Sequence, residues 1–330
     1  MIISASRRTD IPAYYSEWFL NRIKEGFLLV PNPRNPKQVS RIELSPVSLD
    51  AERVSPNESS PSGKVTCIVF WTKNPEPFLP ALDVLDKLKY LYYFEFTLTA
   101  YKNDIEKNLP PKEKIITTFK QLSSRLGPDF VDWRYDPIII NKELSINWHL
   151  EAFYNICKEI HKYTNRCIIS FVDQLQGGRN FAVPKEDDIY KLAAGLSQTT
   201  KEFNLPLLTC SEQIDLSAYG IEHSSCIDKN KIEKLIGYPI DTKKDSGQRK
   251  LCRCIKSVDI GMYNTCKHGC LYCYATTSWQ TTLRQAENHN PFSPMLTGSL
   301  DGTETILPRT SSVRKTMQHS NVTDERHRIR

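Results

Sequence analysis

The chain alternates between two hydrophobic periods. Seven short runs are rich in β-branched and aromatic residues, and between them apolar residues recur at helical spacing, as in Phe78–Lys89. This alternation is typical of repeated strand–helix units and a parallel sheet. The predicted strands are Ile2–Ser6, Thr66–Trp71, Tyr93–Thr99, Phe130–Arg134, Cys167–Phe171, Leu207–Ser211 and Val258–Tyr263. The predicted helices are Ser16–Glu25, Phe78–Lys89, Glu113–Leu126, His149–Tyr163, Glu186–Phe203 and Lys229–Ile236.

Polar side chains gather where the predicted strands end. Arg7-Arg8-Thr9-Asp10 follows the first strand, Thr72-Lys73-Asn74 follows the second, and Arg134-Tyr135-Asp136 ends the fourth. Catalytic groups of α/β barrels come from the carboxyl ends of several strands. We therefore predict a partial or full (β/α) barrel of parallel strands rather than an open doubly wound sheet. The candidate catalytic residues at its mouth are Arg7, Asp10, Lys73, Arg134 and Asp136.

At 330 residues the chain is long enough for one large α/β domain, which we place at residues 1–300. A Pro- and Ser-rich insertion at 31–63 follows the first predicted helix, with one extra strand near Val39–Leu44. Apolar residues become few towards the C-terminus, so we expect 301–330 to be a disordered basic tail.

The net charge of +6 is concentrated at the C-terminus. Residues 309–330 hold six Lys and Arg against Asp324 and Glu325, which leaves only +2 for the rest of the chain. So weak a charge argues against nucleic acid as a partner without excluding it. The sequence has no run of about 18 apolar residues and no signal-peptide pattern, so we expect a cytoplasmic protein with no membrane partner.

Ten cysteines in a chain without an export signal indicate metal binding or catalysis rather than a disulfide framework. Seven of them lie in residues 210–275, and the tightest group is Cys266-Lys-His-Gly-Cys270-Leu-Tyr-Cys273. Three thiolates on one short loop can bind three irons of a [4Fe–4S] cluster and leave the fourth iron open. Gly269 suits a tight turn in this loop because glycine adopts positive φ freely.

Two alternatives to an open cluster remain for this loop. His268 could supply a fourth ligand and complete a zinc site, because structural zinc takes four Cys or His ligands. The three cysteines could also be ordinary buried thiols, which is what we expect of Cys67, Cys157 and Cys167 in their apolar elements.

Cys266, Cys270, Tyr272 and Cys273 resemble the cluster loop of radical S-adenosylmethionine (SAM) enzymes, in which an aromatic residue commonly precedes the third cysteine. The resemblance implies a partial α/β barrel, bound SAM, and a [4Fe–4S] cluster held by the three cysteines. It implies an enzyme that generates a 5′-deoxyadenosyl radical to abstract hydrogen from an unknown substrate. An external electron donor such as a flavodoxin or ferredoxin would be its partner. The alternative is a non-radical zinc or iron–sulfur protein on the same barrel, acting on nucleic acid.

In the enzymes that this loop resembles, the cluster loop follows the first strand, whereas here it is permuted to the C-terminal end. The last strand of a barrel can lie beside the first, so Ile2–Ser6 would flank the cluster. Arg7, Arg8 and Asp10 then become candidate SAM-binding residues, and Tyr272 would shield one face of the cluster. The Gly-Gly-Glu-like SAM segment of that family is missing after the loop.

A wider set of motifs resembles an uncharacterised bacterial family, the domain of unknown function 1848. The motifs are Arg7-Arg8-Thr9-Asp10, Trp71-Thr72-Lys73-Asn74-Pro75, Trp133-Arg134-Tyr135-Asp136-Pro137 and the C-terminal cysteine loop. This resemblance covers most of residues 1–300 and implies little chemistry, because the activity of the family is unassigned.

Four further cysteines form a candidate second site. Cys252 and Cys254 make a C-x-C pair before the last predicted strand, Cys210 closes the sixth, and Cys226 follows after a short linker. Four thiolates from these positions could hold a second [4Fe–4S] cluster or a zinc ion, unless two or more of them are simply buried.

Overall fold

The computed structural model describes residues 1–47, 63–173, 181–309 and 314–315. Its centre is a parallel sheet of eight strands: β1 (Ile2–Ala5), β4 (Cys67–Thr72), β5 (Tyr92–Thr97), β6 (Val131–Ile138), β7 (Cys167–Phe171), β8 (Leu207–Cys210), β9 (Glu222–Ser224) and β11 (Val258–Asp259). The strand order is β11-β1-β4-β5-β6-β7-β8-β9. The edge strands β11 and β9 are not paired with each other, so the sheet is a partial barrel that does not close. The predicted fold class is confirmed in this open form.

Helices follow most of the strands, as the periodicity predicts. They are α1 (Ile11–Tyr14), α2 (Ser16–Glu25), α3 (Leu82–Lys87), α4 (Lys112–Leu126), α5 (Ile146–Ile160), α7 (Glu186–Glu202), α8 (Lys229–Ile236) and α9 (Trp279–Glu287). Short 3-10 helices lie at Glu76–Ala81, Pro128–Phe130, His161–Tyr163 and Ser217–Tyr219. The single helix predicted over 78–89 is a 3-10 turn followed by α3, because Pro80 lies within it and cannot donate a backbone hydrogen bond.

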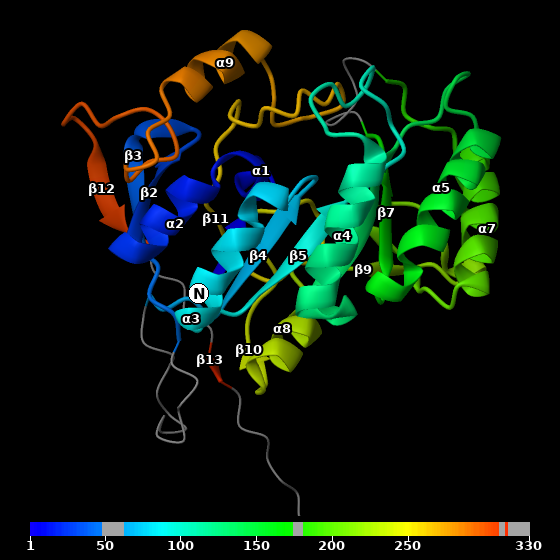
Figure 1. Ribbon diagram of the computed structural model, residues 1–330, viewed down its shortest axis with the longest axis horizontal. Helices are drawn as coiled ribbons and strands as arrows, with labels where there is room; N and C mark the ends of the chain where they lie inside the picture. Colours follow the sequence, from blue (N-terminus) through cyan, green and yellow to red (C-terminus); the bar gives the residue numbers. More distant parts are fainter. Residues whose placement is uncertain (48–62, 174–180, 310–313, 316–330) are drawn as a thin grey trace, which may run out of the picture.

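One face of the sheet is apolar and packs against helices, with α4, α5 and α7 along one side of it (Figure 1). Phe70 of β4 meets Phe19 of α2 with 5.4 Å between ring centroids, and Trp133 of β6 stacks on Phe153 of α5 at 4.7 Å. All four side chains are fully buried. Burial of each such side chain contributes about 1.5–3 kcal/mol.

The opposite face of the sheet is partly charged. Tyr93 and other apolar residues of this face pack against α8, but Asp132 of β6 is also buried there. Asp132 pairs with Arg166 at 2.6 Å and with Lys231 of α8 at 2.5 Å. A buried carboxylate needs such partners, so α8 is held to the sheet by ion pairs as well as by apolar contact.

The last strand lies beside the first, as the permuted order predicts. Ile3 is in register with Val258, and Ser4 with Asp259. The Asp259 carboxylate accepts hydrogen bonds from Ser4 Oγ at 2.8 Å and from Ser6 Oγ at 2.7 Å. The strands β1 and β11, the first and last of the sheet along the chain, are therefore joined by side-chain as well as backbone hydrogen bonds.

The insertion and the C-terminal segment add strands outside the main sheet. The extra strand expected near Val39–Leu44 is present as β3 (Asn35–Glu43), which forms a hairpin with β2 (Phe27–Asn32). Within the segment expected to be a tail, β12 (Thr305–Pro308) pairs with β3, and β13 (Arg314–Lys315) pairs with β10 (Ile240–Asp241). The unpaired edge of a hairpin can recruit a strand that has few apolar residues, because pairing uses backbone groups. Residues 316–330 lie outside the described part of the chain.

Candidate functional site

The cysteine loop, residues 264–275, follows β11 and lies beside the carboxyl end of β1. The Tyr15 hydroxyl donates to the Thr265 carbonyl at 2.6 Å, and Thr9 Oγ1 lies 2.5 Å from Thr265 Oγ1. From the other side, the backbone N–H of Leu271 donates to the Ile105 carbonyl at 3.0 Å. Segments that follow β1 and β5 therefore hold the loop in place.

The loop turns at two residues with positive φ. Asn264 has a φ of 56° and Gly269 a φ of 66°, so the turn predicted at Gly269 is confirmed. A Cβ atom at Gly269 would also lie 3.3 Å from Asn108 Nδ2. Both the backbone angle and the close neighbour favour glycine between the first two cysteines.

Cys266, Cys270 and Cys273 are partly buried, and none of them forms a disulfide. Burial and the charges of Asp10 and Cys273 raise the pKa of Cys266 to about 12. The pKa of Cys270 is raised by burial, against Lys73, with contributions from the other two thiols. The three thiols thus lie within electrostatic reach of one another. Among the described residues no three His, Cys, Asp or Glu side chains form a group that could hold a metal ion as they stand. Metal binding by this loop therefore requires the thiols to deprotonate and their side chains to rearrange.

His268 has both ring nitrogens hydrogen-bonded to other residues. Its Nδ1 pairs with the Tyr14 hydroxyl at 3.0 Å, and its Nε2 pairs with Asp10 Oδ2 at 2.6 Å. The side chain is 3% exposed. A metal-binding imidazole needs one nitrogen free, so this arrangement does not favour His268 as a fourth ligand.

Asp10 connects the cysteine loop to β1 and β4. Besides His268, its Oδ2 accepts the backbone N–H of Lys73 at 2.7 Å, and its Oδ1 caps α1 by accepting the N–H of Ala13 at 3.0 Å. The carboxylate predicted to bind SAM is therefore occupied with local partners, and it fixes the orientation of His268.

Glu106 lies under the loop, at the centre of a buried polar network. It accepts hydrogen bonds from Lys73 Nζ at 2.7 Å, from Lys112 Nζ at 2.5 Å and from the Tyr272 hydroxyl. Burial works to raise its pKa, but the two lysines lower it to about 2. No pattern in the sequence points to Glu106, because it lies in a polar loop away from any strand end. The candidate residues Lys73 and Tyr272 are brought together by it.

Arg7 and Arg8 point to different partners. The Arg8 guanidinium forms an ion pair with Asp259 at 3.0 Å. Arg7 lies over the Trp71 ring at 4.6 Å from the centroid, and its buried Nη1 and Nη2 have no hydrogen-bond partner within the described part of the chain. Burial lowers the pKa of Arg7, but the nearby thiols, Cys254 first, and Asp259 raise it above its ordinary value. Arg7 therefore faces the second cysteine group.

Arg134 and Asp136 lie on β6 and form a buried ion pair. Arg134 Nη1 also donates to Glu95 at 3.1 Å and to the Cys226 sulfur at 2.8 Å. Ser170 of β7 donates to the other oxygen of Asp136. Burial lowers the pKa of Lys73, but the charges of Glu106, Cys270 and Asp136 raise it above its ordinary value, so Lys73 interacts with both the cysteine loop and this pair.

The second group of cysteines is assembled from three places in the chain. Cys210 Sγ, at the end of β8, lies 3.1 Å from Cys226 Sγ, which follows β9. Cys254 Sγ accepts the backbone N–H of Ile227, the neighbour of Cys226, at 3.3 Å. The thiols of Cys226 and Cys252 both influence the pKa of Cys254, so all four predicted thiols lie in one region of the structure.

A sequence model of the family described as Domain of unknown function (DUF1848) matches residues 2–275. The chain belongs to this family. The match includes both cysteine groups and every candidate site residue. No curated protein and no solved structure matches the chain. Among the residues that the structure of this DUF1848 protein describes, no helix is both long enough and apolar enough to cross a membrane.

Proposed function

We propose that this DUF1848 protein is a radical-SAM-like iron–sulfur enzyme. In this proposal Cys266, Cys270 and Cys273 bind three irons of a [4Fe–4S] cluster, and the fourth iron stays open for SAM. The observation that carries the proposal is the state of His268, whose two nitrogens are hydrogen-bonded to Tyr14 and Asp10. Three thiols without a fourth ligand from their own loop suit an open cluster better than a closed zinc site.

When bound, such a cluster supplies one electron that cleaves the S–C5′ bond of SAM, which gives methionine and the 5′-deoxyadenosyl radical that abstracts hydrogen from the substrate. The chain itself positions the ligands and excludes water. Asp10 fixes one side of the loop through His268, and Tyr272 is held on the other side by its hydrogen bond to Glu106. Tyr272 is buried, which fits the shielding role predicted for it.

Among the proposed mouth residues, Lys73 has the position best suited to act near the cluster. Its ammonium lies 2.7 Å from Glu106 and interacts with the charges of Cys270 and Asp136. A fixed cation there favours the anionic state of a thiolate-bound cluster. Arg8 and Asp10 remain proposed contacts of the SAM carboxylate and amino groups, for which SAM would have to compete with their partners Asp259 and His268. Arg134 and Asp136, which are paired with each other, remain proposed contacts of the substrate.

The test is to reconstitute the protein anaerobically with iron and sulfide, reduce it, add SAM and measure 5′-deoxyadenosine. We expect the wild type to form it, and Cys270→Ser to bind less iron and lose at least 90% of the product. Cys157→Ala, which removes a thiol buried in α5, is the matched control and should retain both. If the reconstituted wild type contains no acid-labile sulfide, or cleaves no SAM, the proposal is wrong.

A non-radical metalloprotein is the second candidate. It is favoured by the second cysteine group, whose four thiols supply a complete ligand set without an open position. In that case metal is bound but no 5′-deoxyadenosine forms in the assay above. Affinity for DNA or RNA that falls steeply with salt would further identify a nucleic-acid substrate.

A further inference from the structure

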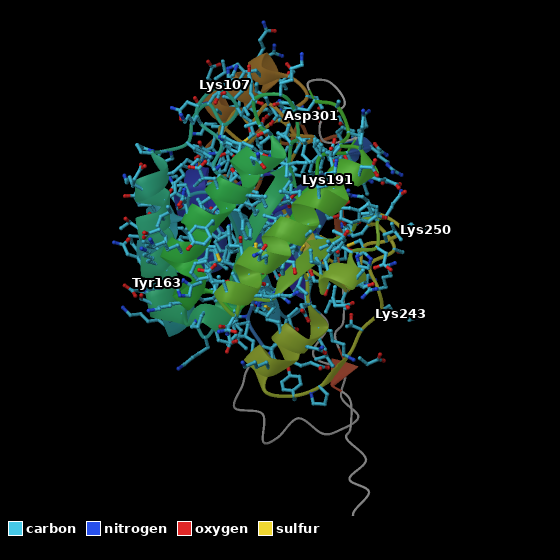
Figure 2. All side chains as sticks on the ribbon, turned by 90° about the vertical axis from the view of Figure 1, so that its right-hand side faces the viewer. Lys107, Tyr163, Lys191, Lys243, Lys250 and Asp301 are labelled. Carbon is cyan, nitrogen blue, oxygen red and sulfur yellow. The ribbon has the colours of Figure 1, made fainter. Side chains whose placement is uncertain are left out.

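The second cysteine group lies across the open side of the partial barrel. Cys210 and Cys226 belong to β8 and to the turn after β9, at one edge of the sheet. Cys252 and Cys254 directly precede β11, the opposite edge strand. The Cys252–Cys254 segment contacts the chain just after β9, since the backbone N–H of Ile255 donates to the Ile227 carbonyl, and it then leads into β11 at the other edge. Lys243 and Lys250, in the stretch between β10 and Cys252, extend into solvent at the surface (Figure 2).

The side chains of this segment alternate between surface and interior. Leu251 and Arg253 are exposed, whereas Cys252 and Cys254 are 6% and 1% exposed. Together with Cys226 they pack among Ile227 and other apolar side chains of the same face. Because side chains in an extended segment alternate between its two sides, Cys252 and Cys254 place both sulfurs on the buried side.

Two guanidinium groups face these sulfurs. Arg134 donates to Cys226 Sγ at 2.8 Å. Two buried guanidinium nitrogens of Arg7 have no hydrogen-bond partner among the residues that the structure describes, and Cys254, Cys226 and Cys252 are among the charges that act on this side chain. Leaving a buried guanidinium without an acceptor is costly, and four neutral thiols are poor acceptors. Four thiolates around one divalent cation carry two net negative charges, which these two arginines would balance.

The sulfur spacing distinguishes between a single metal ion and a cluster. Four thiolates at about 2.3 Å from a tetrahedral zinc lie about 3.8 Å from one another. The sulfurs of Cys210 and Cys226 are 3.1 Å apart, and Cys254 Sγ lies 3.3 Å from the backbone nitrogen of Ile227, beside Cys226. A [4Fe–4S] cubane separates its ligand sulfurs by the width of the whole cluster, so the close Cys210–Cys226 pair suits a single ion better. Among the described residues no group is already arranged to hold a metal ion, so binding requires the four thiols to deprotonate and their side chains to rearrange.

We propose that Cys210, Cys226, Cys252 and Cys254 bind one zinc ion, with Arg134 and Arg7 balancing its thiolate charge. The ion would cross-link the β8–β9 edge of the sheet to the Cys252–Cys254 segment, which is followed by β11 and the first cysteine loop. This site is structural, since four protein ligands leave no open position. It does not rest on the radical chemistry proposed above, because neither its ligands nor its metal is shared with Cys266, Cys270 and Cys273; Arg134 is the residue that the two proposals have in common.

The experiment is elemental analysis of the full-length chain purified with zinc present and without iron–sulfur reconstitution. We expect about one zinc per chain in the wild type, in Cys270→Ser and in the buried-thiol control Cys157→Ala, and loss of most of it in Cys254→Ser. Iron with acid-labile sulfide that survives in Cys270→Ser but disappears in Cys254→Ser would show a cluster instead. A Cys210–Cys226 disulfide found by mass spectrometry in the metal-free protein would also overturn the proposal.

X-ray absorption at the zinc edge of the wild type keeps the test valid if Cys254→Ser does not fold. Four sulfur ligands at about 2.3 Å are expected, and nitrogen or oxygen ligands would contradict the assignment.

The role of Arg7 in balancing the thiolate charge is tested separately, by measuring the rate at which a chelator removes zinc. Arg7→Met should lose zinc at least about threefold faster. Arg253→Gln, which alters an exposed arginine between two of the ligands, should not change the rate. Equal rates for both variants would exclude the role given to Arg7.

Discussion

At the scale of single residues, buried polar side chains with specific partners organise the site. Asp10, Glu106 and Asp259 each accept several hydrogen bonds from segments that are distant in sequence. Each lies where a loop must be held against the sheet, and the lysines around Glu106 lower its pKa despite burial. The residues around the cysteine loop are therefore positioned by buried carboxylates as much as by apolar packing.

His149 of α5 makes the stability of the protein depend on pH. It is fully buried, its Nδ1 lies 2.9 Å from the Tyr135 hydroxyl, and its Nε2 lies 2.7 Å from the Ile139 carbonyl. Burial, partly offset by the bond to Ile139, lowers its pKa to about 4. The unfolded chain takes up this proton near pH 6.5 and the folded chain only near pH 4. The contribution of neutral, buried His149 to the free energy of unfolding is therefore fully present above pH 6.5. It falls by roughly 3 kcal/mol as the pH is lowered to 4.

Urea unfolding of the wild type and His149→Gln across this pH range measures the effect. The difference in unfolding free energy between the two should change by roughly 3 kcal/mol between pH 7 and pH 4. The control is His161→Gln, at the half-buried histidine just beyond α5, which should keep the wild-type pH dependence. If both variants follow the wild type, His149 does not carry this proton linkage.

At the scale of elements, the cysteine loop depends on the close approach of β1 and β11. The backbone after β11 passes so near β1 that a Cβ atom at Gly261 would lie 2.1 Å from Ser6 Oγ and 2.6 Å from Ser6 Cβ. Ser6 itself is hydrogen-bonded to Asp259, so it cannot easily move away. Glycine at 261 is required by space rather than by its backbone angle.

Gly261→Ala should therefore lower the free energy of unfolding by about 1–3 kcal/mol through overpacking at the β1–β11 junction. The same variant should bind less iron on reconstitution, because the cysteine loop begins directly after this position. Gly247→Ala is the matched control, since its Cβ would meet only the flexible Asp245 side chain, at 3.2 Å. Wild-type stability in Gly261→Ala would show that the junction can relax.

At the scale of the whole molecule, the partial barrel is open, and its two edges are linked by chain segments rather than by strand pairing. Asp259 holds the β11 edge to β1 through Ser4, Ser6 and Arg8. The proposed zinc site links the other edge to the segment before β11. The Asp259 contacts and the proposed zinc site both hold residues 252–275, the segment that ends in the first cysteine loop.

Asp259→Asn should weaken this edge of the molecule by at least about 2 kcal/mol, because it leaves the Arg8 guanidinium without its carboxylate partner. Hydrogen exchange should rise first in residues 258–275, while β5 and β6 at the centre of the sheet remain protected. The exposed Asp241→Asn is the control and should leave exchange unchanged. An even rise over all strands would indicate that the edge does not open separately from the rest.

The sequence by itself determined the features that depend on neighbours in the chain. Periodicity predicted seven of the eight strands of the sheet and the helices between them, with Cys167–Phe171 and Ser16–Glu25 at their observed bounds. It missed β9, which has only three residues, and α9, whose hydrophobic face is largely exposed. Cysteine spacing predicted one compact loop, and the C-terminal position of that loop predicted the pairing of β11 with β1.

Only the tertiary structure decided which distant side chains meet. It brought Cys210 and Cys226 to within 3.1 Å, directed Arg7 to the second cysteine group, occupied both nitrogens of His268 and placed Glu106 beneath Tyr272. It also left the barrel open. Local periodicity reports which face of an element is buried, whereas these contacts depend on how separate elements are placed across the sheet, and that placement is fixed by the packing of the whole chain.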